Sequence, residues 1–170
     1  SQLEMIVSKI RPIDASWLDK ARGRTAQLVM PPRALGRLHN MAERISAIQE
    51  SLEPAVTNKA ILIMAADHGI LAEGVSAFPQ SVTGEMLKTF LSGGAGINVL
   101  SRLVNADIRV VDMGIIPDMN AMARDNADRF RVHKIANGSA NFSKGPAMTK
   151  HQARLAIMTG FELASNMVAD

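Results

Sequence analysis

The sequence predicts an α/β fold: a Rossmann-like parallel sheet with crossover helices, in three layers, preceded by an N-terminal helical segment. Three observations carry this prediction. Residues 60–65 are an apolar run and residues 107–114 a β-branched run ending in glycine, and both have the length and composition of strands. The residues between these two runs have the apolar spacing of helices. Two strands that are joined by a helical crossover pair in parallel. A polar loop with glycines follows the first run, at the strand end where open α/β sheets bind ligands.

The N-terminal helical segment is expected to span residues 1–55, and the first half of an α/β parallel-sheet domain residues 56–170. Pro12 disfavours an early helix, so we expect an extended lead-in over residues 1–18. A first helix is then expected over residues 18–28.

A long amphipathic helix is expected after the break at Pro31 and Pro32, and it should end near Leu52. Apolar side chains at helical spacing should form its packed face. They are Leu35, Leu38, Ala42, Ile45 and Ile48.

Two helices are expected between the first two strands. Ser81 should cap the first, and Gly93 and Gly94 should end it. Their apolar positions are Val82, Met86 and Phe90 in the first helix, and Ile97, Leu100 and Leu103 in the second.

After the second strand, residues 115–128 have no clean period and should form an excursion near the end of the sheet. A third strand is expected at residues 130–135, and Thr149 with Gln152 matches a capping box for a last helix. Its apolar face would be Ala153, Ile157, Phe161, Ala164 and Val168. Three parallel strands leave an unprotected edge, so the sheet is expected to be incomplete. We therefore expect a homodimer or association with a C-terminal half.

Composition excludes several classes of protein. A chain of 170 residues suits one domain with a sizeable core. The net charge of +3, without a Lys/Arg run or interleaved aromatic residues, gives no sign of a nucleic-acid partner. The absence of Cys excludes disulfides and thiolate metal sites. No apolar stretch approaches the roughly 20 residues that span a bilayer, and no signal-peptide pattern is seen, so we expect a cytoplasmic protein without a membrane partner.

Asp67 and His68 stand at the end of the first strand. A His beside a carboxylate can act as a general base or bind a metal. The structural alternative is that Asp67 caps a turn and His68 hydrogen-bonds the backbone. His133 and His151 lie far off in sequence, so no metal site is expected, and a structural or pocket-orienting use of the pair is favoured.

Phe78, Pro79, Gln80 and Met86 are candidates for a pocket that takes a flat ring. A residue before proline is held extended, so the Phe78 ring is presented in a fixed direction. The thioether of Met86 suits an adaptable wall. The alternative for Phe78 is a core residue that packs against the following helix as a hydrophobic staple, and the alternative for Met86 is an ordinary core residue.

Two glycine-rich loops are candidates for phosphate sites. Residues 93–98 lie between two helices, which favours a tight turn over a dinucleotide loop. Residues 138–149 lie between a strand and a helix N-terminus. The backbone N–H groups there can bind an anion, and the alternative is that the segment is an ordinary loop with a helix cap.

Five segments occur together in the order and at the spacing of one enzyme family. They are PPRALGRL at residues 31–38, the loop at 67–83, GGAGINVL at 93–100, VVDMG at 110–114 and GPAM at 145–148. Through them nearly the whole chain resembles the nicotinate-nucleotide:dimethylbenzimidazole phosphoribosyltransferases, which make the lower-ligand nucleotide of cobalamin.

The resemblance implies transfer of phosphoribose from nicotinate mononucleotide to 5,6-dimethylbenzimidazole or a related base, giving α-ribazole 5′-phosphate, with no cofactor. By this likeness Phe78, Pro79, Gln80 and Met86 line the benzimidazole slot, with Asp67 and His68 as further substrate-binding residues. Phe78 stands where many relatives have Tyr.

The chain also departs from the family. Family members are about twice as long, and their general-base Glu lies in the half that is absent here. Glu73, Glu85 and Glu162 do not match that position, so no catalytic residue is assigned in this chain. Two other functions stay open: a non-catalytic truncated homologue acting as a base-binding or assembly module, and a Rossmann-like nucleotide-binding domain of another kind.

Overall fold

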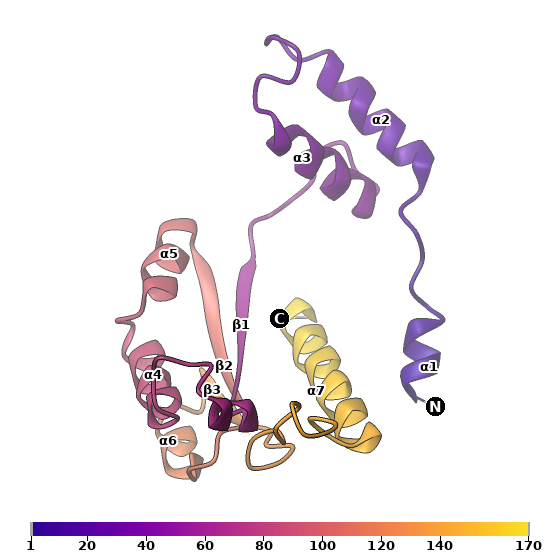
Figure 1. Ribbon diagram of the computed structural model, residues 1–170. Coiled ribbons are helices and arrows are strands. Elements are labelled where there is room, and N and C mark those ends of the chain that lie inside the picture. The colour runs from indigo at the N-terminus through magenta and orange to yellow at the C-terminus, as the bar shows by residue number, and fades with distance from the viewer. Residues whose placement is uncertain (1, 170) are drawn as a thin grey trace. The chain divides into compact units, whose positions relative to one another are not determined.

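The computed structural model describes residues 2–169, which divide into two compact units between Thr57 and Asn58 (Figure 1). The first unit holds α1 (Gln2–Val7), α2 (Ala15–Ala26) and α3 (Arg37–Ile48). The second holds the sheet and the remaining helices. Among the residues that the structure describes, no helix is long and apolar enough to cross a membrane.

The expected extended lead-in is wrong, because α1 forms before the first proline. Residues 2–7 contain neither Gly nor Pro, and Pro12 falls in the segment after α1, where it interrupts nothing. The second helix then begins at Ala15, earlier than expected, because Asp14 is its N-cap: the backbone N–H of Ser16 donates to Asp14 Oδ1 at 2.8 Å.

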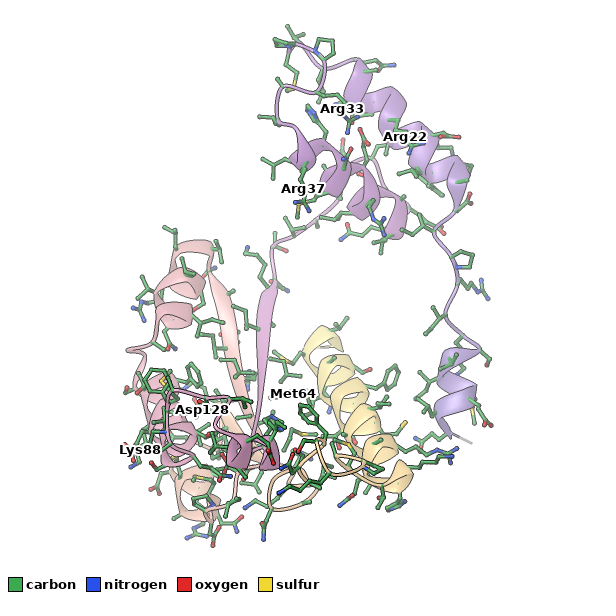
Figure 2. The ribbon with its side chains drawn as sticks, viewed as in Figure 1. Arg22, Arg33, Arg37, Met64, Lys88 and Asp128 are labelled. Carbon is green, nitrogen blue, oxygen red and sulfur yellow. The ribbon has the colours of Figure 1, made fainter. Side chains whose placement is uncertain are left out.

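The packed face of α3 differs from the expected one. Leu35, Leu38 and Ile48 are exposed, and the helix ends at Ile48. Polar pairing explains the difference. Nη1 of Arg33, labelled in Figure 2, lies 3.5 Å from Oε1 of the buried Glu43. The face of α3 that packs therefore contains a charged residue, and the apolar stripe remains exposed. The buried residues of α3 are His39, Glu43, Ser46 and Ala47.

The second unit is built on the predicted parallel sheet. Its strands are β1 (Lys59–Ala66), β2 (Ala106–Gly114) and β3 (Phe130–Val132), in the order β1-β2-β3, and both pairings are parallel. The third strand is shorter than expected. The chain beyond it nevertheless stays bonded to β2, because the backbone N–H groups of residues 133 and 135 donate to carbonyls of β2 at 2.9 Å.

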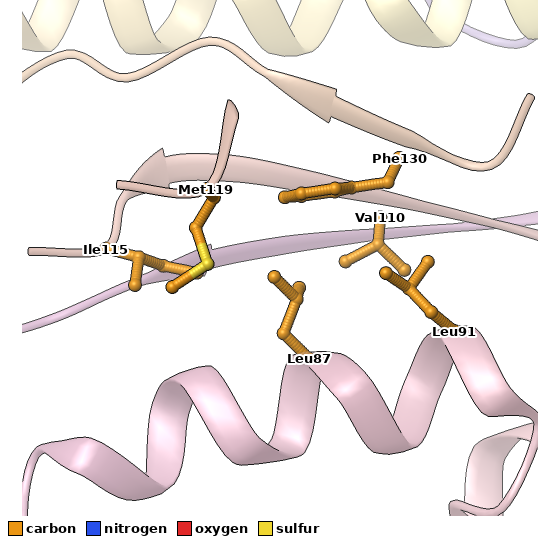
Figure 3. Packing of buried hydrophobic residues seen from close by; sticks show 6 residues of the cluster. All are labelled: Leu87, Leu91, Val110, Ile115, Met119 and Phe130. Carbon is orange, nitrogen blue, oxygen red and sulfur yellow. The ribbon is translucent and has the colours of Figure 1, made fainter. Parts of the chain in front are cut away.

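One face of the sheet carries α4 (Ser81–Ser92) and α5 (Gly96–Val104), and the main core lies there (Figure 3). Leu87 and Leu91 of α4 point at the strands. The excursion after β2 contains α6 (Asn120–Asp125) and sends two residues into this core. The core residues are Leu87, Leu91, Val110, Ile115, Met119 and Phe130.

Two details of α4 and α5 differ from the expectation. The N-cap of α4 is Gln80 rather than Ser81. In α5 the buried residues are Asn98 and Ser101, while Leu100 and Leu103 are exposed. The Asn98 side chain explains this choice, because it accepts from the Ala95 N–H at 3.2 Å and donates to the Phe90 carbonyl at 2.9 Å. The expected helix–helix turn is confirmed, since Gly93 caps α4 with a φ of 82°.

The opposite face of the sheet carries α7 (Lys150–Ala169), which gives the predicted three layers (Figures 1 and 3). Its capping box is confirmed: Gln152 N–H donates to Thr149 Oγ1 at 3.2 Å, and Thr149 N–H donates to Gln152 Oε1 at 2.9 Å. The helix comes close to the sheet at Gly160, where an added Cβ would lie 3.6 Å from Cε of Met64 (Figure 2).

The expected apolar face of α7 is not the one that packs. Ile157, Phe161 and Val168 are exposed. The helix lies against β1 at Gly160 instead, next to the side chain of Met64.

Candidate functional site

All six residues singled out in the sequence line one cavity, at the end of β1 and the start of α4. We call it the α4 cavity; its volume is about 380 Å³. Its walls come from the end of β1, the loop after it and the first turns of α4. The six residues are Asp67, His68, Phe78, Pro79, Gln80 and Met86.

The loop after β1 shapes the outer wall of the α4 cavity. A short 3-10 helix, η1 (Gly69–Glu73), ends at Gly74 with a φ of 70°, a conformation that favours glycine. Ser76 then holds the next turn, because its Oγ accepts from the backbone N–H of Phe78 at 3.1 Å. The Phe78 side chain is 67% exposed and lines the cavity, so it is a wall residue open to solvent and not the core residue of the alternative interpretation.

Asp67 is the most buried polar residue of this wall, with 2% of its surface exposed. Its Oδ2 accepts from the backbone N–H of Ile116 at 2.8 Å. The carboxylate therefore ties the end of β1 to the chain beyond β2, and does not cap a local turn. Its other oxygen, Oδ1, has no hydrogen-bond partner among the described residues.

His68 stands beside Asp67 and faces a different partner. Its Nδ1 lies 3.1 Å from Oγ of Ser139, a residue of the second glycine-rich loop, and the two residues form an isolated parallel bridge. The pairing joins positions 71 apart in sequence, so no local spacing could have revealed Ser139 as the partner of His68. Within residues 2–169 no group of three or more His, Cys, Asp or Glu side chains is arranged to hold a metal ion.

A second cavity shares the lining residues Ala66 and His68 with the α4 cavity, and we call it the α7 cavity. Its volume is about 620 Å³, and the loop at residues 135–140, the segment at 146–150 and the first turns of α7 surround it. Most of the side chains lining it are apolar, among them Met113, Ile135 and Met148. The lining also includes Ser139, Thr149 and Lys150, and the anion site expected at this loop stays a prediction.

A polar cluster beside the cavities joins their two loops. Asn141 Nδ2 donates to Glu73 Oε1 at 2.6 Å, and Lys144 Nζ lies 3.5 Å from the same oxygen. The hydrogen bond from Asn141 is the main reason that the pKa of Glu73 is lowered, with smaller contributions from Ser143 and Lys144. Glu73 is therefore held as a carboxylate in a structural contact.

The chain is similar to known proteins over almost its whole length. A family model described as "Phosphoribosyltransferase" matches residues 10–170. The nicotinate-nucleotide–dimethylbenzimidazole phosphoribosyltransferase of Geobacter metallireducens is 46% identical over 164 residues, which are 96% of this chain and 45% of that protein. The enzyme of the same name from Pseudomonas fluorescens is 41% identical over 94% of this chain and 44% of its own length.

Solved structures give the same result. The crystal structure of the nicotinate-nucleotide–dimethylbenzimidazole phosphoribosyltransferase of Thermus thermophilus matches with a TM-score of 0.82 and 39% identity, over 92% of this chain and 46% of that one. The chain thus spans about half the length of the relatives it matches. By sequence and by structure, this chain belongs to the family of nicotinate-nucleotide–dimethylbenzimidazole phosphoribosyltransferases.

Proposed function

We propose that this chain supplies part of the acceptor-base pocket of an enzyme that transfers phosphoribose from nicotinate mononucleotide to 5,6-dimethylbenzimidazole or a related base. The product would be α-ribazole 5′-phosphate, in the assembly of the cobalamin lower ligand. The observation that carries the proposal is the α4 cavity, into whose walls the fold brings all six residues expected to bind substrate. Its volume of about 380 Å³ lies within the range of small-molecule sites, roughly 300–1,000 Å³.

The reaction needs a flat nucleophile held against an activated sugar. A ring nitrogen of the base forms a bond to C1′ of the ribose while the bond from C1′ to nicotinate breaks, and nicotinate leaves with the electron pair. The base then loses its N–H proton to a general base. The α4 cavity serves the first requirement, because an aromatic ring and apolar side chains favour a planar guest and hold it in one orientation. The general base and the phosphate contacts are assigned to the part of the enzyme beyond this chain.

Association with that part would also cover apolar side chains that are exposed here. Leu103 of α5 and Phe161 and Val168 of α7 are examples. A second copy of the chain is the other candidate to cover them.

Activity tests the proposal directly. We expect α-ribazole 5′-phosphate to form from nicotinate mononucleotide and dimethylbenzimidazole when the chain is combined with the complementary half of the enzyme, because only together do they hold base, sugar and proton acceptor. Chromatography of the reaction mixture detects the product. Absence of product in the combined sample refutes the transferase, and base binding without turnover supports the non-catalytic module.

Truncation of the aromatic wall tests the pocket itself. Phe78→Ala should weaken dimethylbenzimidazole binding by roughly 2- to 12-fold, because a ring–ring contact is worth about 0.5–1.5 kcal/mol beyond its buried area. Isothermal titration calorimetry measures the change. Phe142→Ala is the matched control, since Phe142 is similarly exposed, at 62%, and lies outside the lining of the α4 cavity. Equal losses in both variants would show that the guest binds elsewhere.

A further inference from the structure

The polar cluster of Glu73, Asn141 and Lys144 lies in the lining of neither cavity, and the proposed function does not use it. The cluster nevertheless joins the two loops from which the cavities are built. Glu73 is the last residue of η1, and two other residues of this short helix, Ile70 and Leu71, line the α4 cavity. Asn141 directly follows the part of the second glycine-rich loop that lines the α7 cavity.

The short helix η1 contacts the second glycine-rich loop at both of its ends. At its start, the N–H of Gly69 donates to the Ser139 carbonyl at 2.9 Å, and the N–H of Ser139 donates to the Asp67 carbonyl at 3.0 Å. At its end, the contact is made by side chains, because Glu73 Oε1 accepts from Asn141 Nδ2 at 2.6 Å. If the second contact is lost, η1 is held to this loop mainly at Gly69.

The Asn141 side chain is held in one orientation. Its Oδ1 accepts from the backbone N–H of Ser143 at 3.0 Å and from the Ser143 hydroxyl at 2.8 Å, so its Nδ2 group faces Glu73. A hydrogen bond to a carboxylate is stronger than one to a neutral acceptor. The nearby Lys144 contributes less, because its Nζ lies 3.5 Å from Glu73 Oε1 and 74% of its side chain is exposed.

We propose that Glu73 is a positioning residue for the α4 cavity, which acts through Asn141 by holding the end of η1 against the second glycine-rich loop. With both ends of η1 fixed, Ile70 and Leu71 keep their places in the wall before a guest arrives. The guest then binds more tightly, because it does not have to order this part of the wall. The inference rests on the proposed function only in taking dimethylbenzimidazole as the guest.

Asn141→Asp tests the contact by exchanging one amide group for an oxygen. The Oδ1 atom can still accept both hydrogen bonds from Ser143, and the new Oδ2 faces the Glu73 carboxylate where the amide had been. Because like charges repel, the end of η1 should separate from the second glycine-rich loop. Glu73→Ala is the second variant, since it removes the acceptor without adding a charge and should loosen η1 in the same way.

Two measurements follow the effect of each variant. The backbone N–H groups of Leu71 and Gly74 donate to carbonyls within this segment, so their hydrogen exchange, followed by NMR, reports its opening. In Asn141→Asp their exchange should become faster on the order of ten- to a hundred-fold, because a hydrogen bond to a charged group has this strength. The dissociation constant for dimethylbenzimidazole, measured by calorimetric titration, should rise by roughly 3- to 10-fold.

The double variant Glu73→Gln/Asn141→Asp distinguishes the direct contact from a general disturbance of the loops. The glutamine amide can donate to the aspartate oxygen, so the bond is rebuilt with donor and acceptor exchanged. The double variant also has the same number of charges as the unaltered chain. Hydrogen exchange and affinity should both return to within about twofold of the values of the unaltered chain.

Glu85→Gln is the matched control. Glu85 also contacts a lysine, since its Oε1 lies 2.7 Å from Lys88 Nζ, but it lies in the lining of neither cavity. This variant should leave the hydrogen exchange of η1 and the affinity for dimethylbenzimidazole unchanged. Circular dichroism and urea denaturation confirm that each variant is folded under the conditions of the titration.

Each outcome supports or overturns a separate statement. Unchanged exchange in Asn141→Asp, or a double variant that restores neither quantity, overturns the role of the contact between Glu73 and Asn141. Faster exchange with unchanged affinity overturns the positioning role and leaves the base pocket standing. If the unaltered chain does not bind dimethylbenzimidazole, both the positioning role and the pocket of the proposed function are overturned.

Discussion

Replacing Phe130 by Ala should lower the free energy of unfolding of the second unit by about 3–5 kcal/mol. The Phe130 side chain is fully buried on β3 and lies among the core residues that α4 and β2 contribute (Figure 3). Its loss removes the packing of a whole ring and leaves a cavity that the rigid strand cannot fill. Domains are stable by only about 5–15 kcal/mol, so this single change removes a large part of the total. Urea denaturation followed by circular dichroism measures the difference.

Two exposed phenylalanines provide the control for this prediction. Phe78→Ala and Phe142→Ala should change the same free energy by less than about 0.5 kcal/mol, because both side chains are largely in solvent. If Phe130→Ala costs no more than these two, the core does not lie between β3 and α4.

Gly69→Ala should be the most damaging small change near the site. An added Cβ would lie 2.7 Å from the backbone N of Asn141 and 2.8 Å from the backbone O of Ser139. Both atoms belong to backbone, so the loop itself must move, and the hydrogen bond from Gly69 N–H to Ser139 O, 2.9 Å long, is strained with it. We expect a loss of about 1–3 kcal/mol in the free energy of unfolding. Binding of dimethylbenzimidazole should weaken as well, because His68 shifts with its neighbour.

Gly145→Ala is the matched control, since nothing lies within 4 Å of the added Cβ and the backbone there needs no positive φ. Its urea midpoint and its dimethylbenzimidazole affinity should stay close to those of the unaltered chain. Equal behaviour of the two variants would mean that the loops after β1 and β3 are not in contact.

Features that depend on neighbouring residues could be predicted from the sequence. The apolar run of β1, the glycine turn between α4 and α5 and the Thr149–Gln152 capping box are of this kind, because each is decided within a few residues. The six residues of the α4 cavity come together for the same reason. Five of them follow one strand within fourteen positions (67–80), and the sixth lies on the helix that this loop enters.

Features that depend on the rest of the molecule could not be predicted. Helical periodicity identifies an apolar stripe but does not show what covers it. It therefore predicts that the apolar stripe of α5 is buried, whereas Asn98 is the buried residue in the structure. In α7 the stripe of Ile157 and Phe161 is exposed, and the helix approaches β1 at Gly160 instead. The hydrogen bond from the backbone N–H of Ile116 to the carboxylate of Asp67 joins residues 49 positions apart, and no pattern in the sequence predicts it.

The shared position of His68 has a consequence for how the two cavities behave. This residue lines both the α4 cavity and the α7 cavity, and its Nδ1 lies 3.1 Å from Oγ of Ser139. A molecule that binds in one cavity and rotates the imidazole of His68 therefore changes the shape of the other cavity. Thermodynamic reciprocity then requires each occupant to alter the affinity for the other by the same factor, so that order of arrival has no effect on the final equilibrium.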